Sequence, residues 1–105
     1  MRPFRLSPAA AQDLAEIKAF VASERPGAVD GVLDALEAAC QLVAKYPGVG
    51  RTRDEIDEGV KSFPVGSHVL FYYADEDAVG IARILHGSRD LATAFDDDSQ
   101  GPAEA

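Results

Sequence analysis

Five basic side chains in the C-terminal half of the chain are of the types that could cleave RNA without a metal ion. They are Arg51, Arg53, Lys61, Arg83 and His86. Such a reaction needs a base for the 2′-hydroxyl proton, positive charge for the phosphorane and an acid for the leaving oxygen. Arg83 and His86 stand three positions apart in one β-rich run, so a regular strand points them to opposite faces. This spacing argues against one shared site, unless the strand bulges or ends at Gly87.

The same side chains also have structural explanations. Arg83 could pair with an acid at the sheet edge, and His86 could be a satisfied histidine at a strand end. Arg89 and Asp90 could form a local pair. No aromatic or basic residue follows Phe95 to stack on a base or hold a phosphate. The pattern therefore favours a binding surface over a nuclease site, with these candidate target contacts: Arg51, Arg53, Arg83, His86 and Arg89.

Composition and charge restrict the function classes further. The chain has 105 residues, of which 47% are hydrophobic, and a net charge of −8. This length fits one domain, which we place at residues 1–95. Residues 96–105 hold four acids and no base, and we expect this acidic tail to be disordered. Because an acidic protein is repelled by nucleic acid at long range, the charge weighs against a ribonuclease or a DNA-binding protein.

The cysteine and histidine content predicts neither a metal site nor a cofactor. One Cys and two His residues lack the spacing of metal ligands. Cys40 stands among apolar positions of a helical pattern and should be a buried thiol. No segment approaches the roughly 20 apolar residues of a membrane span, and the N-terminus lacks the apolar run of a signal peptide. We therefore expect a cytoplasmic protein that does not bind a membrane.

The first half of the chain predicts two helices. Ser7 and Pro8 supply an N-cap and a proline at the first helical position. The first helix continues to about residue 23, with an apolar stripe at Ala10, Leu14, Ile17 and Val21. Asp13, Glu16 and Lys18 fall off this stripe and should be solvated.

A break at residues 25–27 precedes the second helix, which Pro47 and Gly48 stop. Its apolar positions follow spacings of four and three, at Val29, Leu33, Leu36, Cys40 and Val43. Because the connection is short, the two helices should form an antiparallel hairpin.

The second half changes to strand-like patterns. β-rich runs cover residues 60–64, 68–74 and 79–86, in addition to a short strand at residues 4–6. The three runs in the second half are joined by connections that are short enough to require antiparallel pairing. The order β-α-α-β-β-β predicts an α+β domain, in which a two-helix hairpin packs on a small, mainly antiparallel sheet.

The predicted sheet is apolar on both faces. In residues 68–74, Val69, Phe71 and Tyr73 alternate with Leu70 and Tyr72; in residues 79–86, Val79, Ile81, Arg83 and Leu85 alternate with Gly80, Ala82, Ile84 and His86. The helices can cover only one face. The tail or the loop at 48–59 could cover the other, or a partner protein could bind there. The candidate partner contacts are Leu70, Tyr72 and Ile84, or Leu14 and Ile17 if the helices are used.

Several runs resemble one known family. Residues 60–73, VKSFPVGSHVLFYY, are similar to the central hairpin of ParE-type toxins, and residues 83–91, RILHGSRDL, look like their last strand and its exit. Weaker matches lie at residues 6–17 and 46–53. All four runs occur along the chain in the order expected for that family. The chain thus resembles the RelE/ParE superfamily of toxins, and is closer to the ParE branch.

The resemblance implies a RelE-like fold and a type II toxin that a ParD-like antitoxin neutralises in a hetero-oligomer. The usual target of ParE toxins is DNA gyrase, whereas RelE-like relatives cut mRNA in the ribosome. Inhibition by binding needs no acid–base set, so gyrase is the favoured target and ribosome-dependent mRNA cleavage is the alternative. A non-toxic interaction module or a degenerate toxin is a third possibility.

Overall fold

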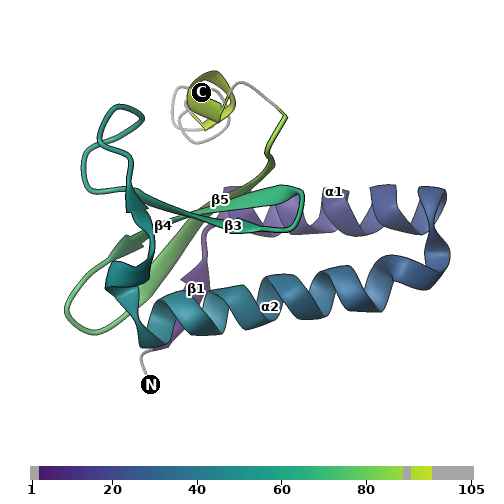
Figure 1. Ribbon diagram of the computed structural model, residues 1–105, viewed down its shortest axis with the longest axis horizontal. Coiled ribbons are helices and arrows are strands. Elements are labelled where there is room, and N and C mark those ends of the chain that lie inside the picture. Colours follow the sequence, from purple (N-terminus) through teal and green to yellow (C-terminus); the bar gives the residue numbers. More distant parts are fainter. Residues whose placement is uncertain (1–2, 89–90, 96–105) are drawn as a thin grey trace.

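A computed structural model describes residues 3–88 and 91–95 of the chain (Figure 1). Its elements, in chain order, are β1 (Phe4–Leu6), α1 (Pro8–Glu24), the 3-10 helix η1 (Pro26–Ala28), α2 (Val29–Lys45), the 3-10 helix η2 (Pro47–Val49), β2 (Arg51–Thr52), β3 (Lys61–Val65), β4 (His68–Ala74) and β5 (Val79–His86). A short helix at residues 91–95 follows. The predicted acidic tail lies outside the described residues.

The helices begin and end where the sequence predicts. The Ser7 hydroxyl oxygen accepts the Ala10 N–H at 2.9 Å, and Pro8 is the first residue of α1. The same hydroxyl donates to the Ala82 carbonyl at 2.8 Å, which ties the start of α1 to β5. Prolines just after α1 and α2 prevent either helix from continuing. The predicted antiparallel hairpin is confirmed, and Figure 1 shows it extending beyond the sheet.

The sheet has five strands in the order β1-β5-β4-β3-β2. β1 pairs parallel with β5 and the other pairs are antiparallel, so the α+β class with a mainly antiparallel sheet is confirmed. The two-residue edge strand β2 was not predicted. It is too short to give a periodic pattern and exists only through its pairing with β3.

One face of the sheet packs against the helices and forms the larger core. Leu70, Tyr72 and Ile84 point to this face and are at most 2% exposed. They pack with Leu36 and Val43 of α2. The predicted alternation of β4 is therefore confirmed, but the prediction that these three residues lie on an open face is wrong.

The other face is covered by the chain itself. Phe71 and Leu85 pack with Ile56 and Val60 of the loop before β3 and with Phe95 of the short helix. The rings of Phe71 and Phe95 meet edge to face with centroids 5.6 Å apart. Figure 1 shows the loop and the short helix on the opposite side of the sheet from α2. This face is thus a second core. The chain itself covers it, and it is not left open for a partner protein.

A bulge in β5 changes which side chains share a face. Phe71 pairs with Arg83, but Tyr72 pairs with Ile81, so one residue of β5 is extra. Ile81 and Ile84 both face the helices as a result, while Leu85 lies in the second core. The predicted regular alternation along residues 79–86 is wrong at this position.

Candidate functional site

Arg83 is buried and fully engaged with other parts of the chain. Its Nε and Nη2 donate to the two carboxylate oxygens of Asp13, both at 2.6 Å, and its Nη1 donates to the Ala94 carbonyl at 2.9 Å. The side chain is 2% exposed and Asp13 is 6% exposed. Asp13 also accepts the backbone N–H of Ile84 at 3.0 Å. Arg83 therefore joins α1, β5 and the short helix, and it presents no surface to a target.

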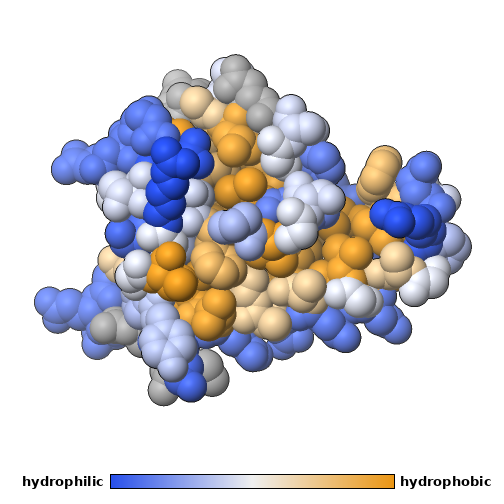
Figure 2. All heavy atoms as spheres, in the orientation of Figure 1, coloured by the Kyte–Doolittle hydropathy of each residue, from blue (hydrophilic) through white to orange (hydrophobic). Residues whose placement is uncertain are grey.

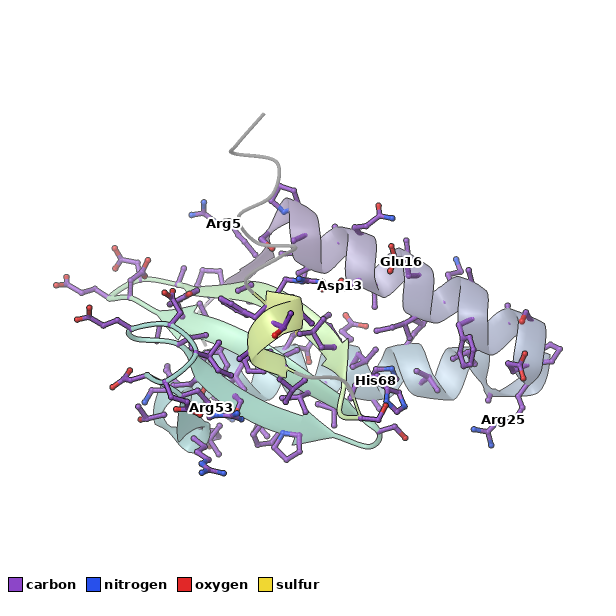
Figure 3. The ribbon with its side chains drawn as sticks, turned by 90° about the horizontal axis from the view of Figure 1, so that it is seen from above. Arg5, Asp13, Glu16, Arg25, Arg53 and His68 are labelled. Atoms are coloured by element: carbon purple, nitrogen blue, oxygen red, sulfur yellow. The ribbon has the colours of Figure 1, made fainter. Side chains whose placement is uncertain are left out.

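This arrangement corrects the expectation for Asp13 and decides between the explanations for Arg83. Asp13 falls off the apolar stripe of α1, but it lies inside the protein because it pairs with Arg83. Figure 3 shows it on the part of α1 that lies over the sheet. Of the two explanations for Arg83, pairing with an acid is the one found.

The five basic residues do not converge on one site. Arg51, Ser62, Phe71 and Arg83 lie in one row across β2, β3, β4 and β5. Phe71, in the middle of this row, belongs to the second core and packs against Phe95. Ser62 and Phe71 therefore separate the buried Arg83 from the exposed Arg51.

Arg53 is partly sequestered, whereas Arg51 is exposed. Arg53 Nε donates to Glu55 at 2.6 Å, its Nη1 donates to the Ser62 hydroxyl at 3.4 Å, and its guanidinium lies 6.0 Å from the centroid of Phe71. The hydrogen bond from Arg53 lowers the pKa of Glu55. Lys61 Nζ donates to Thr52 at 3.3 Å. Arg51 thus remains the most accessible cation of this edge.

His86 belongs to a different end of the sheet. It pairs across the strands with His68, and the two ring centroids are 5.4 Å apart. Its Nδ1 accepts the Ser88 N–H at 3.2 Å and contacts the Ser88 hydroxyl at 2.7 Å. Burial, and then the charge of His86, lower the pKa of His68. Figure 3 shows His68 at the end of the sheet nearer the hairpin tip and Arg53 at the other end.

An apolar groove lies beside this histidine pair. It consists of two adjoining cavities of about 620 and 370 Å³, which share Phe20, His68 and His86 as lining residues. Val21, Val32 and Leu36 line the larger cavity and Ile17 the smaller one. Figure 2 shows hydrophobic side chains, in orange, gathered between the two helices. We call this surface the interhelical groove.

Three predicted residues border apolar cavities, and a fourth residue, Phe20, was not predicted. Ile17 lines the groove, and Leu14 lines a separate cavity of about 290 Å³ that Ile84 also borders. Phe20 was overlooked although it is 66% exposed. Its position three residues after Ile17 places it beside the apolar stripe of α1, which is the signal that could have identified it.

Tyr72 was a candidate partner contact, but it anchors a loop instead. Its hydroxyl donates to the Pro47 carbonyl at 2.7 Å and accepts the Gly50 N–H at 2.9 Å. A Cβ atom on Gly50 would clash with that hydroxyl, so only glycine fits here. Burial raises the pKa of Tyr72, so the hydroxyl keeps the proton that it donates.

Potential metal ligands and the single cysteine are placed as follows in the described part of the chain. Within residues 3–88 and 91–95, no three His, Cys, Asp or Glu side chains are grouped as metal ligands. Cys40 is buried, and burial together with Glu37 raises its pKa to about 11, as expected for a structural thiol. None of the described helices has the length and apolarity required to cross a membrane. Arg89 and Asp90 lie outside the described residues.

Comparison with known proteins identifies the class. Residues 4–91 match the family model described as the ParE toxin of the type II toxin–antitoxin system parDE. The toxin ParE1 of Caulobacter vibrioides is 35% identical over 91 residues, which cover 84% of this chain and 92% of the relative. The toxin RelE3 of the same organism is 31% identical over 87 residues, with 82% and 95% covered.

A solved structure supports the same fold. It is described as the chromosomal ParDE system from P. aeruginosa and aligns with a TM-score of 0.70 at 16% identity, covering 82% of this chain and 96% of that chain. The fold is therefore RelE-like, as the resemblance implied. The chain belongs to the ParE toxin family of type II toxin–antitoxin systems, within the RelE/ParE superfamily.

Proposed function

We propose that this toxin inhibits DNA gyrase by binding to it, in the cytoplasm, and that a ParD-like antitoxin neutralises it. The burial of Arg83 carries the proposal. A ribonuclease of the kind considered above needs several cationic and acid–base groups around one phosphate. Here the Arg83 guanidinium is held by Asp13 and Ala94, and Ser62 and Phe71 stand between it and Arg51 in the sheet. Inhibition by binding requires only a complementary surface, and it suits a chain with a net charge of −8.

The target surface should include the edge of the sheet at β2. Arg51 is exposed there, and Arg53 and Lys61 lie beside it. His86 lines the interhelical groove and not this edge, and Arg89, which lies outside the described residues, stays a candidate from the sequence. Of the predicted target contacts, Arg83 is withdrawn because it is inaccessible.

The antitoxin should dock in the interhelical groove. An antitoxin must bind tightly, which requires burial of apolar surface, and the groove offers Ile17, Val32 and the exposed Phe20. Leu14 contributes to an adjacent cavity. An aliphatic or aromatic side chain of the antitoxin would fill the larger cavity, and the complex would be a hetero-oligomer.

The test measures supercoiling by purified gyrase at increasing toxin concentration. Arg51→Glu should raise the concentration needed for half-inhibition, and the difference from the unmodified toxin should shrink at high salt. Arg5→Glu is the matched control, because Arg5 is exposed on β1 at the opposite edge of the sheet. Full supercoiling at every toxin concentration would refute the proposal.

A further inference from the structure

Exposed hydrophobic side chains are concentrated at the end of α2. Leu42 is 37% exposed, Tyr46 54% and Val49 46%. The Tyr46 N–H donates to the Leu42 carbonyl and the Val49 N–H to the Tyr46 carbonyl, so the three residues follow one another by single turns. We call these three exposed residues the α2-end stripe. Figure 2 shows hydrophobic atoms at the surface over this end of the molecule, at lower left.

Cations flank this stripe. Lys45 Nζ lies 5.5 Å from the centroid of the Tyr46 ring, and Arg51 is exposed on β2, directly after η2 and Gly50. Lys61 lies on the neighbouring strand, opposite Thr52. In a chain with a net charge of −8, a hydrophobic stripe with cations on both sides is complementary to an acidic protein surface that contains an apolar recess.

The stripe is held rigidly from inside the protein. Tyr72 is fully buried, and its hydroxyl bonds to Pro47 and Gly50 at either end of η2. These bonds fix the segment that carries Val49 and leads to Arg51. A surface that is ordered before binding loses less conformational entropy on association, so a rigid loop with exposed hydrophobic side chains suits recognition.

We propose that the α2-end stripe, flanked by Lys45 and Arg51, is the surface that contacts gyrase, and that Tyr72 is its positioning residue. This inference rests on the proposed function. It adds the apolar side chains of the target surface and the residue that holds them in place. The interhelical groove lies toward the hairpin tip. The α2-end stripe lies at the other end of α2 (Figure 1). The toxin therefore has separate surfaces for its target and its antitoxin.

The first experiment replaces apolar side chains one at a time in the full chain and measures half-inhibition of purified gyrase. Tyr46→Ala should raise the required toxin concentration roughly tenfold, as loss of an aromatic interface anchor does, and Val49→Ala should raise it several-fold. Leu6→Ala is the control, because Leu6 is 36% exposed on β1 and lies outside the α2-end stripe. It should change the concentration by less than about twofold.

The second experiment tests whether Tyr72 acts through the stripe. Tyr72→Phe removes only the hydroxyl and should also weaken inhibition. In the Tyr46→Ala background the same change should have a smaller effect, because the contact that it positions is already lost. A general loss of stability would weaken inhibition equally in both backgrounds, so the double-mutant cycle separates positioning from destabilisation.

The outcomes distinguish this inference from the proposed function. If the unmodified toxin inhibits gyrase but Tyr46→Ala and Val49→Ala inhibit as well as Leu6→Ala, the stripe is not the target surface and only the inference is wrong. The same holds if these variants lose affinity for the cognate antitoxin in titration calorimetry while they still inhibit gyrase. If the unmodified toxin leaves gyrase active, the proposed function fails and the inference fails with it.

Discussion

Replacing Asp13 with alanine should show how much the buried Asp13–Arg83 pair contributes to the free energy of unfolding. The substitution removes both carboxylate acceptors of a guanidinium that is 2% exposed and keeps the Ala94 carbonyl, and it also removes the side-chain acceptor of the Ile84 N–H. Breaking one side of a buried ion pair costs about 3–5 kcal/mol, since the remaining charge is uncompensated. The free energy of unfolding of such a domain is about 5–15 kcal/mol, so Asp13→Ala should be the most destabilising change in α1.

Urea unfolding measures this effect. A loss of about 4 kcal/mol at a slope of about 2 kcal/mol/M lowers the midpoint by about 2 M. Asp34→Ala is the matched control, because it makes the same chemical change at an exposed position of α2 and should alter the free energy of unfolding by less than about 0.5 kcal/mol.

A double variant separates pairing from function. Asp13→Leu with Arg83→Met replaces the ion pair by apolar side chains and should recover most of the lost stability. If Arg83 is purely structural, this variant should also inhibit gyrase as the unmodified toxin does. A cost below about 1 kcal/mol for Asp13→Ala would refute the reasoning, since it would mean that Arg83 finds solvent or another partner at little expense.

Three further predictions concern the histidine pair, the second core and the acidic tail. Because the folded-state pKa of His68 lies below its usual value of 6.5, the folded protein should lose stability as the pH falls below about 6.5, and should stop losing it below the folded pKa. His68→Gln should lack this part of the pH dependence in urea unfolding. Phe95→Ala should cost about 3–5 kcal/mol, measured in the same way. Truncation after Phe95 should leave the midpoint unchanged, whereas a lower midpoint would show that the tail contributes.

Local signals in the sequence predicted most of the secondary structure. The N-cap at Ser7, the proline after it and the prolines that follow each helix act within a few residues, so they can be recognised without the fold. The alternation of β4 likewise separated Leu70 and Tyr72 from Phe71. It could not say which set faces the helices, because that depends on how the hairpin crosses the sheet.

The buried pair was beyond sequence reasoning for a related reason. Asp13 and Arg83 are 70 residues apart, and neither follows the apolar pattern of its element. The bulge between Ile81 and Ile84 adds a residue without any change in composition, so strict alternation placed Ile81 and Ile84 on opposite faces. Arg83 consequently looked like an accessible cation. The anchoring role of Tyr72 was hidden too, since its partners are backbone atoms of η2 and Gly50.

The most direct test of the account compares two purified systems with the same toxin preparation. One measures DNA supercoiling by gyrase, and the other measures cleavage of mRNA on translating ribosomes. The account predicts that the toxin stops supercoiling, that added cognate antitoxin restores it, and that ribosome-bound mRNA stays intact. Codon-dependent mRNA cleavage that is lost in a folded Arg83→Ala variant, with supercoiling unaffected, would contradict it and establish the ribonuclease.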